Sequence, residues 1–171
     1  MWLLALAPAF LAVLGVVVPR LRPDNTRQPS AYALEVSVLR RNGLERRVPP
    51  GAPLSPGAKV ILRLSTERPG YLTVLDVDSA HRVKQHVPRQ GAPVSIPAGA
   101  HQPLEANIQL GEALGPERFI ALVCEGPLPE EQVRAAAEHS LNEACGNPAR
   151  MAALDLPCKQ AMFLIEKVAP L

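Results

Sequence analysis

Hydrophobic and polar residues alternate along several short segments of the chain, with the period of two that is typical of β-strands. Residues 33–38 (ALEVSV) place Leu34, Val36 and Val38 on one face, and residues 59–65 (KVILRLS) repeat the alternation. Such segments predict strands with one buried and one exposed face in an antiparallel sheet. A central strand is predicted for the more evenly apolar YLTVLDVD (71–78). Further candidate strands are RVKQHV (82–87), ANIQL (106–110), RFIALVC (118–124) and AMFLIEKV (161–168).

Turn-forming residues separate these candidate strands and account for many of the 19 prolines. Pro-Gly pairs stand at 50–51, 56–57 and 69–70, and residues 78–81 (DSAH) form a further turn signal. Seven to nine short antiparallel strands without intervening helices predict a mainly β fold. The expected architecture is an immunoglobulin-like β-sandwich over residues 34–171. A small barrel is the alternative.

One helix interrupts the β pattern, over residues 129–145. Glu130 and Glu131 suit the first turn of a helix, and Gly146 suits the position just past its end. Its apolar residues recur at helical spacing, so we expect the helix to lie across the sandwich as a cover. These residues are Val133, Ala137, Leu141 and Ala144.

Residues 1–19 are interpreted as a transmembrane anchor that enters the bilayer through residues 2–18. This apolar run contains no charge, and its seventeen residues give roughly 25 Å of helix, the lower limit for a bilayer. A cleaved signal peptide is the first alternative, but the nearest small-x-small site, at 31–33, lies too far along the chain. A buried core helix is the second. Residues 20–33 are mostly polar and include two prolines, which predicts an extended linker.

The charges around the apolar run bear on its orientation. Arg20, Arg22 and Arg27 follow it and no basic side chain precedes it, a distribution that favours a cytoplasmic location for the domain. Anchors ordinarily begin behind basic residues. We therefore expect either a longer protein upstream or a misassigned start at Met1.

Composition excludes one class of function. Hydrophobic residues make up 47% of the chain and charged residues 20%, which supports a folded core. Lys and Arg outnumber Asp and Glu only by 18 to 16, and the basic residues are scattered. Because nucleic-acid binding needs a concentrated basic surface, no nucleic-acid partner is expected.

The candidate catalytic and metal-binding residues lack partners at useful spacing. His81 and His86 are five residues apart, and odd spacing on a strand places side chains on opposite faces, so no metal site is expected. Cys124 has no histidine tied to it and is expected to be a buried thiol. The sequence contains no phosphate-binding loop, Gly-x-Ser-x-Gly elbow or His-Glu-x-x-His motif. We therefore expect neither enzymatic activity nor a cofactor.

Two cysteines near the C-terminus predict a disulfide. Cys145 ends the predicted helix and Cys158 precedes the last strand, so a bond between them would join helix and sheet. The alternative is two unrelated free thiols. A disulfide is typical of proteins outside the reducing cytoplasm. It would place the domain in the periplasm, on a single-pass protein of the inner membrane, against the tendency of the arginines.

Three stretches carry a resemblance to a known family: RPGYLTVLDVDSAHRVKQHVP, VSIPAGA and GPERFIALVCEGPL. Together they resemble a bacterial domain of unknown function found beside caspase-like peptidases, and the extracytoplasmic part of membrane-anchored zinc-finger anti-sigma factors. The resemblance covers about residues 34–128 and implies a sensory or interaction module without known chemistry. The sequence has no Cys/His zinc-finger region ahead of the apolar run, so sigma-factor binding is not implied.

These observations favour a non-catalytic, membrane-anchored interaction or sensing domain of the bacterial envelope, with an unidentified protein partner. The expected contact turns are those around Asp78, His81 and Arg82 and around Arg89, because loops on a rigid β scaffold often hold binding residues. One alternative is a truncated regulator of the anti-sigma type whose cytoplasmic part is missing. Another is a cell-wall carbohydrate-binding sandwich, which the low aromatic content of 4% disfavours.

Overall fold

The computed structural model describes residues 32–40, 42–104 and 108–170. The predicted anchor and the linker as far as residue 31 lie outside these residues. Within the described ranges, no helix has the length and apolar character needed to cross a membrane. The first strand begins at Tyr32, two residues before the predicted domain boundary, because Tyr32 and Ala33 already pair with the neighbouring strand.

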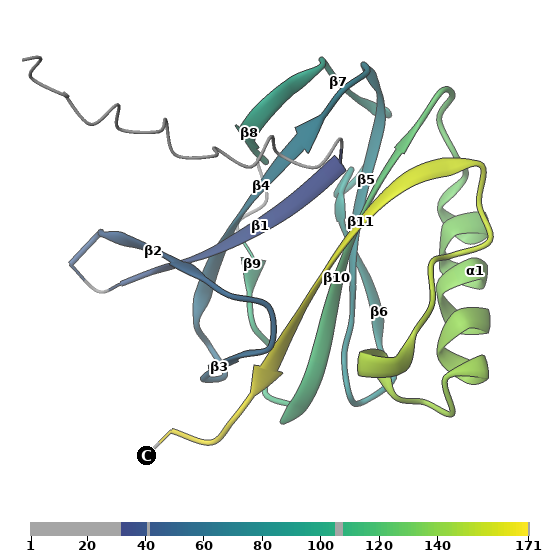
Figure 1. Cartoon of the computed structure of the whole chain (residues 1–171). Helices are drawn as coiled ribbons and strands as arrows, with labels where there is room; N and C mark the ends of the chain where they lie inside the picture. Colours follow the sequence, from purple (N-terminus) through teal and green to yellow (C-terminus); the bar gives the residue numbers. More distant parts are fainter. Residues whose placement is uncertain (1–31, 41, 105–107, 171) are drawn as a thin grey trace, which may run out of the picture.

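The described residues form eleven strands, one α-helix and one 3-10 helix (Figure 1). In chain order they are β1 (Tyr32–Leu39), β2 (Glu45–Val48), β3 (Ala52–Leu54), β4 (Lys59–Thr66), β5 (Gly70–Val77), β6 (Val83–Val87), β7 (Val94–Ile96), β8 (Gly99–Pro103), β9 (Ile108–Gln109), β10 (Gly115–Cys124), α1 (Glu130–Glu143), η1 (Pro148–Arg150) and β11 (Cys158–Lys167).

The strands form two sheets that face each other. One has five strands in the order β2-β1-β4-β8, with β9 also paired to β4, and the other has six in the order β3-β11-β10-β5-β6, with β7 also paired to β5. The prediction of a mainly β sandwich with one helix is confirmed. Its strand number and fully antiparallel pairing are wrong, because eleven strands are present and β3 pairs with β11 in parallel. The unpredicted strands β2, β3, β7 and β8 are short and lack a clear alternation.

The main core lies between the two sheets, where the alternation in the sequence placed it. Val60, Leu62 and Leu64 of β4 are at most 2% exposed and pack with the inner face of the other sheet. Phe119 of β10 and Phe163 of β11 supply its largest side chains. Burying each such side chain stabilises the fold by about 1.5–3 kcal/mol, so this layer holds the two sheets together.

Helix α1 covers the outer face of the six-stranded sheet and creates a second core. Val133, Ala137 and Leu141 of the helix pack with Ile120 and Leu122 of β10 in one buried cluster. The predicted apolar face of the helix is therefore confirmed. Strands β5 and β10 are covered on both sides, which explains why their segments are evenly apolar rather than alternating.

The helix is shorter at each end than the predicted 129–145. Pro129 is the N-cap residue and Ala144 the C-cap residue, so the helical residues are 130–143. Cys145 and Gly146 follow with φ angles of 54° and 74°, and left-handed residues of this kind end a helix.

Replacing Leu122 by Ala is expected to lower the free energy of unfolding by about 2–5 kcal/mol, because the side chain is completely buried between β10 and the helix. Leu44→Ala is the matched control, because Leu44 is 63% exposed and its loss should change stability by less than about 0.5 kcal/mol. Urea unfolding of both variants measures the difference. Equal losses would contradict the assigned second core.

Candidate functional site

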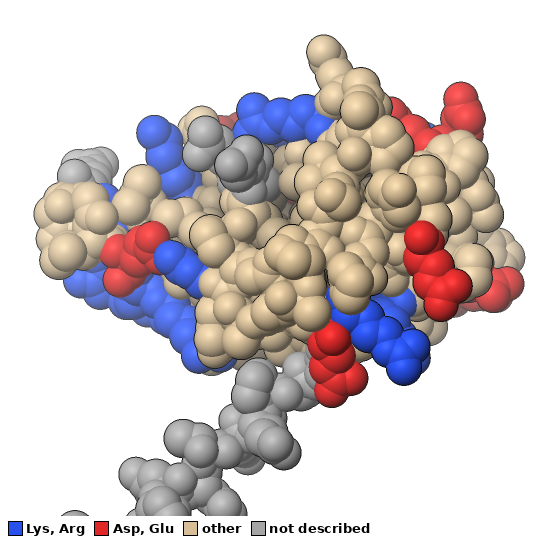
Figure 2. Space-filling model, turned by 90° about the horizontal axis from the view of Figure 1, so that it is seen from above, with Lys and Arg blue, Asp and Glu red and all other residues tan. Residues whose placement is uncertain are grey.

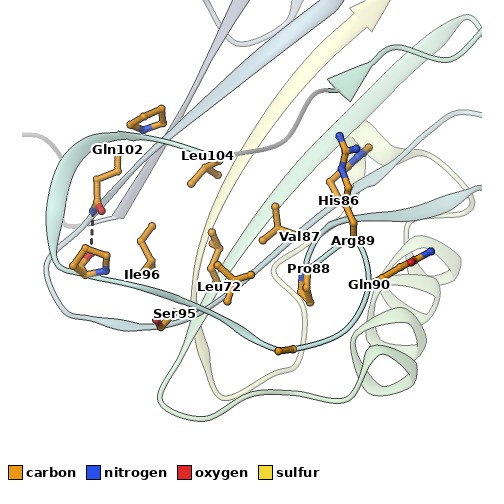
Figure 3. A pocket seen from close by; sticks show the side chains of 14 residues that line it. Leu72, His86, Val87, Pro88, Arg89, Gln90, Ser95, Ile96, Gln102 and Leu104 are labelled. Carbon is orange, nitrogen blue, oxygen red and sulfur yellow. Dashed lines mark hydrogen bonds between the residues drawn. The ribbon is translucent and has the colours of Figure 1, made fainter.

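A groove of about 440 Å³ opens at one end of the sandwich, between β7, β8 and the loop that follows β6. Leu72, Val87, Ile96 and Leu104 form its apolar surface and surround the cavity in Figure 3. Gln102 closes one side, where its side-chain amide donates a hydrogen bond to the Pro97 carbonyl oxygen (2.9 Å). The groove is thus an apolar surface with polar groups at its margin, which is typical of a ligand or peptide site.

The predicted contact residue Arg89 lies on this groove. It follows the cis peptide bond between Val87 and Pro88, and the loop from Pro88 to Ala92 forms one wall. Arg89 is the only Lys, Arg, Asp or Glu residue among the described residues that line the groove. The surrounding end of the molecule, seen from above in Figure 2, is largely uncharged with Lys, Arg, Asp and Glu around its margin.

Two strand edges are open beside the groove. Among the described residues, β8 pairs only with β4, and β7 pairs only with β5. An open edge presents backbone N–H and C=O groups that an added strand satisfies. The groove therefore combines apolar contact surface with backbone hydrogen-bonding groups, the two features of a site for an extended polypeptide.

The other predicted contact turn, between β5 and β6, is held together by its own side chains. The Arg82 guanidinium donates hydrogen bonds from Nε (2.9 Å) and Nη2 (2.6 Å) to Asp78 Oδ2, and Asp78 Oδ1 accepts from the backbone N–H of Ala80. Burial raises the pKa of Asp78, but the Arg82 hydrogen bonds outweigh it and hold the pKa below its usual value. Asp78 and Arg82 therefore stabilise the turn, which the sequence had predicted as a hairpin connection.

The His81 side chain of this turn lies close to Gly146, just past the end of the helix. Its φ angle is 62°, and its ring lies so close to Gly146 that a Cβ there would stand 2.6 Å from His81 Nε2. The β5–β6 turn thus packs against the end of the helix. It does not reach Arg89, because Arg82 and Arg89 lie beyond opposite ends of β6, a five-residue strand about 16 Å long. The structure brings Asp78, His81 and Arg82 together and leaves Arg89 at the other end.

A row of buried ionisable side chains crosses the six-stranded sheet near the β5–β6 turn. Neighbouring strands contribute one residue each, in the order Lys167 (β11), Glu117 (β10), Asp76 (β5) and His86 (β6). Lys167 Nζ lies 2.5 Å from Glu117 Oε2, and His86 Nε2 lies 3.0 Å from Asp76 Oδ2. All four side chains are at most 12% exposed.

Burial shifts the titration of Glu117 strongly. Burial together with the charge of Asp76 raises the pKa of Glu117 to about 7, although Lys167 acts in the opposite direction. Asp76 and Glu117 also line an adjacent cleft of about 500 Å³, whose wall includes the Asp78 turn and one side of the helix. The cleft contains both cationic and anionic side chains.

The sequence interpretation missed Glu117 and Lys167. The alternation along the strands could have indicated both residues. Glu117 lies two residues before the buried Phe119 and Lys167 two residues after the buried Ile165, so each points to the same side of its strand as a core residue. His86, which the sequence analysis considered only together with His81, is paired with Asp76. In the described part of the chain, no group of three or more His, Cys, Asp or Glu residues is placed to hold a metal ion.

The predicted disulfide between Cys145 and Cys158 is wrong. Cys158 is bonded to Cys124, its directly paired residue on β10, and Cys145 is free and exposed. Helix α1 explains the error: Cys145 follows its last turn, and the chain then returns along the helix before β11 begins (Figure 1). Cys145 and Cys158 therefore lie at opposite ends of a helix about 21 Å long.

No protein-family model matches the chain, and neither a curated protein nor a solved structure matches it.

Thiol labelling under denaturing, non-reducing conditions is expected to modify one cysteine per chain, Cys145. Reduction should lower the free energy of unfolding by about 4 kcal/mol, because the disulfide closes a loop of 34 residues in the unfolded chain. As the control, Cys145→Ser should abolish labelling and leave stability unchanged. Labelling of Cys124 in the unreduced wild type would contradict the assigned pairing.

Proposed function

We propose that this chain is a non-catalytic interaction domain of the bacterial envelope, of immunoglobulin-like layout, held at the inner membrane by residues 2–18 and exposed on the periplasmic side. Its partner is a protein, and the contact is an extended segment of that partner bound in the groove of Figure 3. The resemblance to the bacterial domain found beside caspase-like peptidases agrees with this role. No cofactor or nucleic acid takes part.

The disulfide supports the proposed periplasmic location of the domain. Cys124 and Cys158 are directly opposite each other on paired strands, with Cα atoms 4.4 Å apart, so the bond requires no rearrangement of the fold. Disulfides persist where the environment is oxidising and are rare in the cytoplasm. A domain with this bond is suited to the periplasm, whatever the orientation that the nearby arginines favour.

The groove is the observation that carries the interaction. Its apolar residues gain from contact with apolar side chains of a partner, and the open edges of β7 and β8 offer hydrogen bonds only to a group with backbone-like spacing. An extended polypeptide supplies both. A carbohydrate ligand is disfavoured, because carbohydrate sites usually present exposed aromatic rings and the described lining of the groove contains no Trp, Tyr or Phe.

Alkaline phosphatase fused to the C-terminus of the full chain in a bacterial host is expected to be active, because the enzyme matures only where disulfides form. A β-galactosidase fusion at the same position is expected to be inactive, since that reporter works only in the cytoplasm. Enzyme activity normalised to fusion protein is the measurement. The reverse pattern would refute the periplasmic placement while leaving the groove untouched.

Selection of randomised peptides on the purified full chain is expected to yield extended segments that bind the groove. Val94→Asp should weaken their binding at least tenfold, because Val94 lines the groove, is 39% exposed and can be changed without emptying the core. Leu44→Asp is the matched control, since this exposed residue directly precedes β2 and does not line the groove. Equal binding by both variants and the wild type would exclude the groove as the site.

A further inference from the structure

The contact between Lys167 and Glu117 stands out among the ion pairs of the described residues. The Lys167 side chain is 0% exposed and that of Glu117 is 2% exposed, whereas the next least exposed pair includes the partly accessible Asp76. Lys167 Nζ and Glu117 Oε2 lie 2.5 Å apart, and neither atom has a hydrogen bond of regular geometry with any other described group. The ammonium nitrogen and this carboxylate oxygen therefore face each other directly.

A permanent ion pair in this position is costly. Removing an ammonium and a carboxylate from water costs several kcal/mol for each ion, and their attraction compensates only when further hydrogen bonds satisfy both groups. Here Lys167 Nζ and Glu117 Oε2 have no such additional bond to another described group. A reaction that turns the two charges into one neutral group removes this penalty.

Asp76 is placed to move protons between the two groups. Its carboxyl group lies near that of Glu117: both residues line the same cleft, and the charge of Asp76 raises the pKa of Glu117. The other side of Asp76 is fixed by His86 at 3.0 Å. Asp76 thus lies beside the same cleft as one reacting group and is itself held in position.

We propose that Lys167 and Glu117 form an intramolecular amide bond, with Asp76 as the proton relay. The Lys167 nitrogen attacks the carboxyl carbon of Glu117, a C–N bond forms, and one C–O bond of the carboxyl group breaks. The ammonium and the carboxylate become an amide and one water molecule. The departing oxygen takes its two hydrogens from Lys167 Nζ by way of Asp76, which is unchanged at the end. No oxidant, reductant or cofactor is needed.

The structure supplies what this condensation requires. Holding nucleophile and carboxyl group in contact replaces a bimolecular encounter, an effect equivalent to about 10⁵–10⁸ M in well-oriented systems. Burial raises the pKa of Glu117 to about 7, and a protonated carboxyl group is the form that an amine can attack. The cleft beside Asp76 and Glu117 gives the water a route out.

The amide would fasten the strand pair β10–β11 at the end that the disulfide leaves open. Cys124 is paired with Cys158 at one end of the register, and Gly115 is paired with Lys167 at the other. Two covalent bonds would thus close both ends of the pair that joins the C-terminal strand to the sheet. Such a pair resists peeling and proteolysis, which suits a protein exposed outside the cell interior.

Tryptic peptide mapping of the purified full chain tests the proposal directly. The expected product is residues 90–118 joined to residues 160–171, lighter than the two peptides together by one water molecule. Trypsin should leave the bond after Lys167 intact, because its amine is no longer free. Separate peptides 90–118 and 160–167, with cleavage after Lys167 and no linked product, would overturn the proposal.

Two pairs of variants separate chemistry from folding. Lys167→Arg keeps the positive charge but should yield no linked peptide, whereas the exposed Lys84→Arg should leave the linked fraction unchanged. Asp76→Asn should lower the linked fraction at least tenfold, while His86→Gln should retain it, because His86 only positions Asp76. Equal linkage in Asp76→Asn and wild type would remove Asp76 as the relay.

The pH dependence of stability gives an independent readout. An unlinked Glu117 has a native pKa of about 7 against about 4.5 when unfolded, so the unfolded state binds fewer protons between these values and stability falls as pH rises from 4.5 to 7. The amide removes this titration. Wild type should therefore lack the decline that Lys167→Arg shows, and a decline of equal size in both would count against the bond.

Discussion

Burial of the six-stranded sheet on both faces is the constraint on which the rest of the structure depends. The five-stranded sheet covers one face of β5 and β10, and helix α1 covers the other. A polar side chain on these strands has no route to water unless it lies near a strand end, so it must find a partner within the protein. This is why Asp76 and Glu117 stand at the end of the core and are matched by His86 and Lys167.

The two ends of the sandwich consequently have different chemistry. At one end, ionisable side chains from four neighbouring strands meet in a buried row, and Asp78 and Arg82 close the adjoining turn. At the other end, the groove has an apolar surface with polar groups at its margin, and two short strands leave their edges open. Ion pairs fasten the first end. The second end presents apolar surface beside open strand edges, the two features that the proposed partner segment requires.

Much of the fold could be predicted because its signals are local. The alternation at Val60, Leu62 and Leu64 fixed the buried face of β4, and the helical spacing of Val133, Ala137 and Leu141 fixed the face of α1 that packs on the sheet. The groove could not be found in this way. Leu72, Ile96 and Leu104 belong to separate segments, and each is compatible with any buried position.

The sequence by itself determined the longer strands, the chief turns and which side chains of those strands point inward, because periodicity and turn chemistry act over a few residues. Only the tertiary structure decided which strands are neighbours. Cys158 had two possible partners, and the return of the chain along the helix gave it Cys124 instead of Cys145. Lys167 met Glu117 for the same reason: side-chain pairing across strands follows from sheet order, and sheet order depends on contacts between segments far apart in the chain.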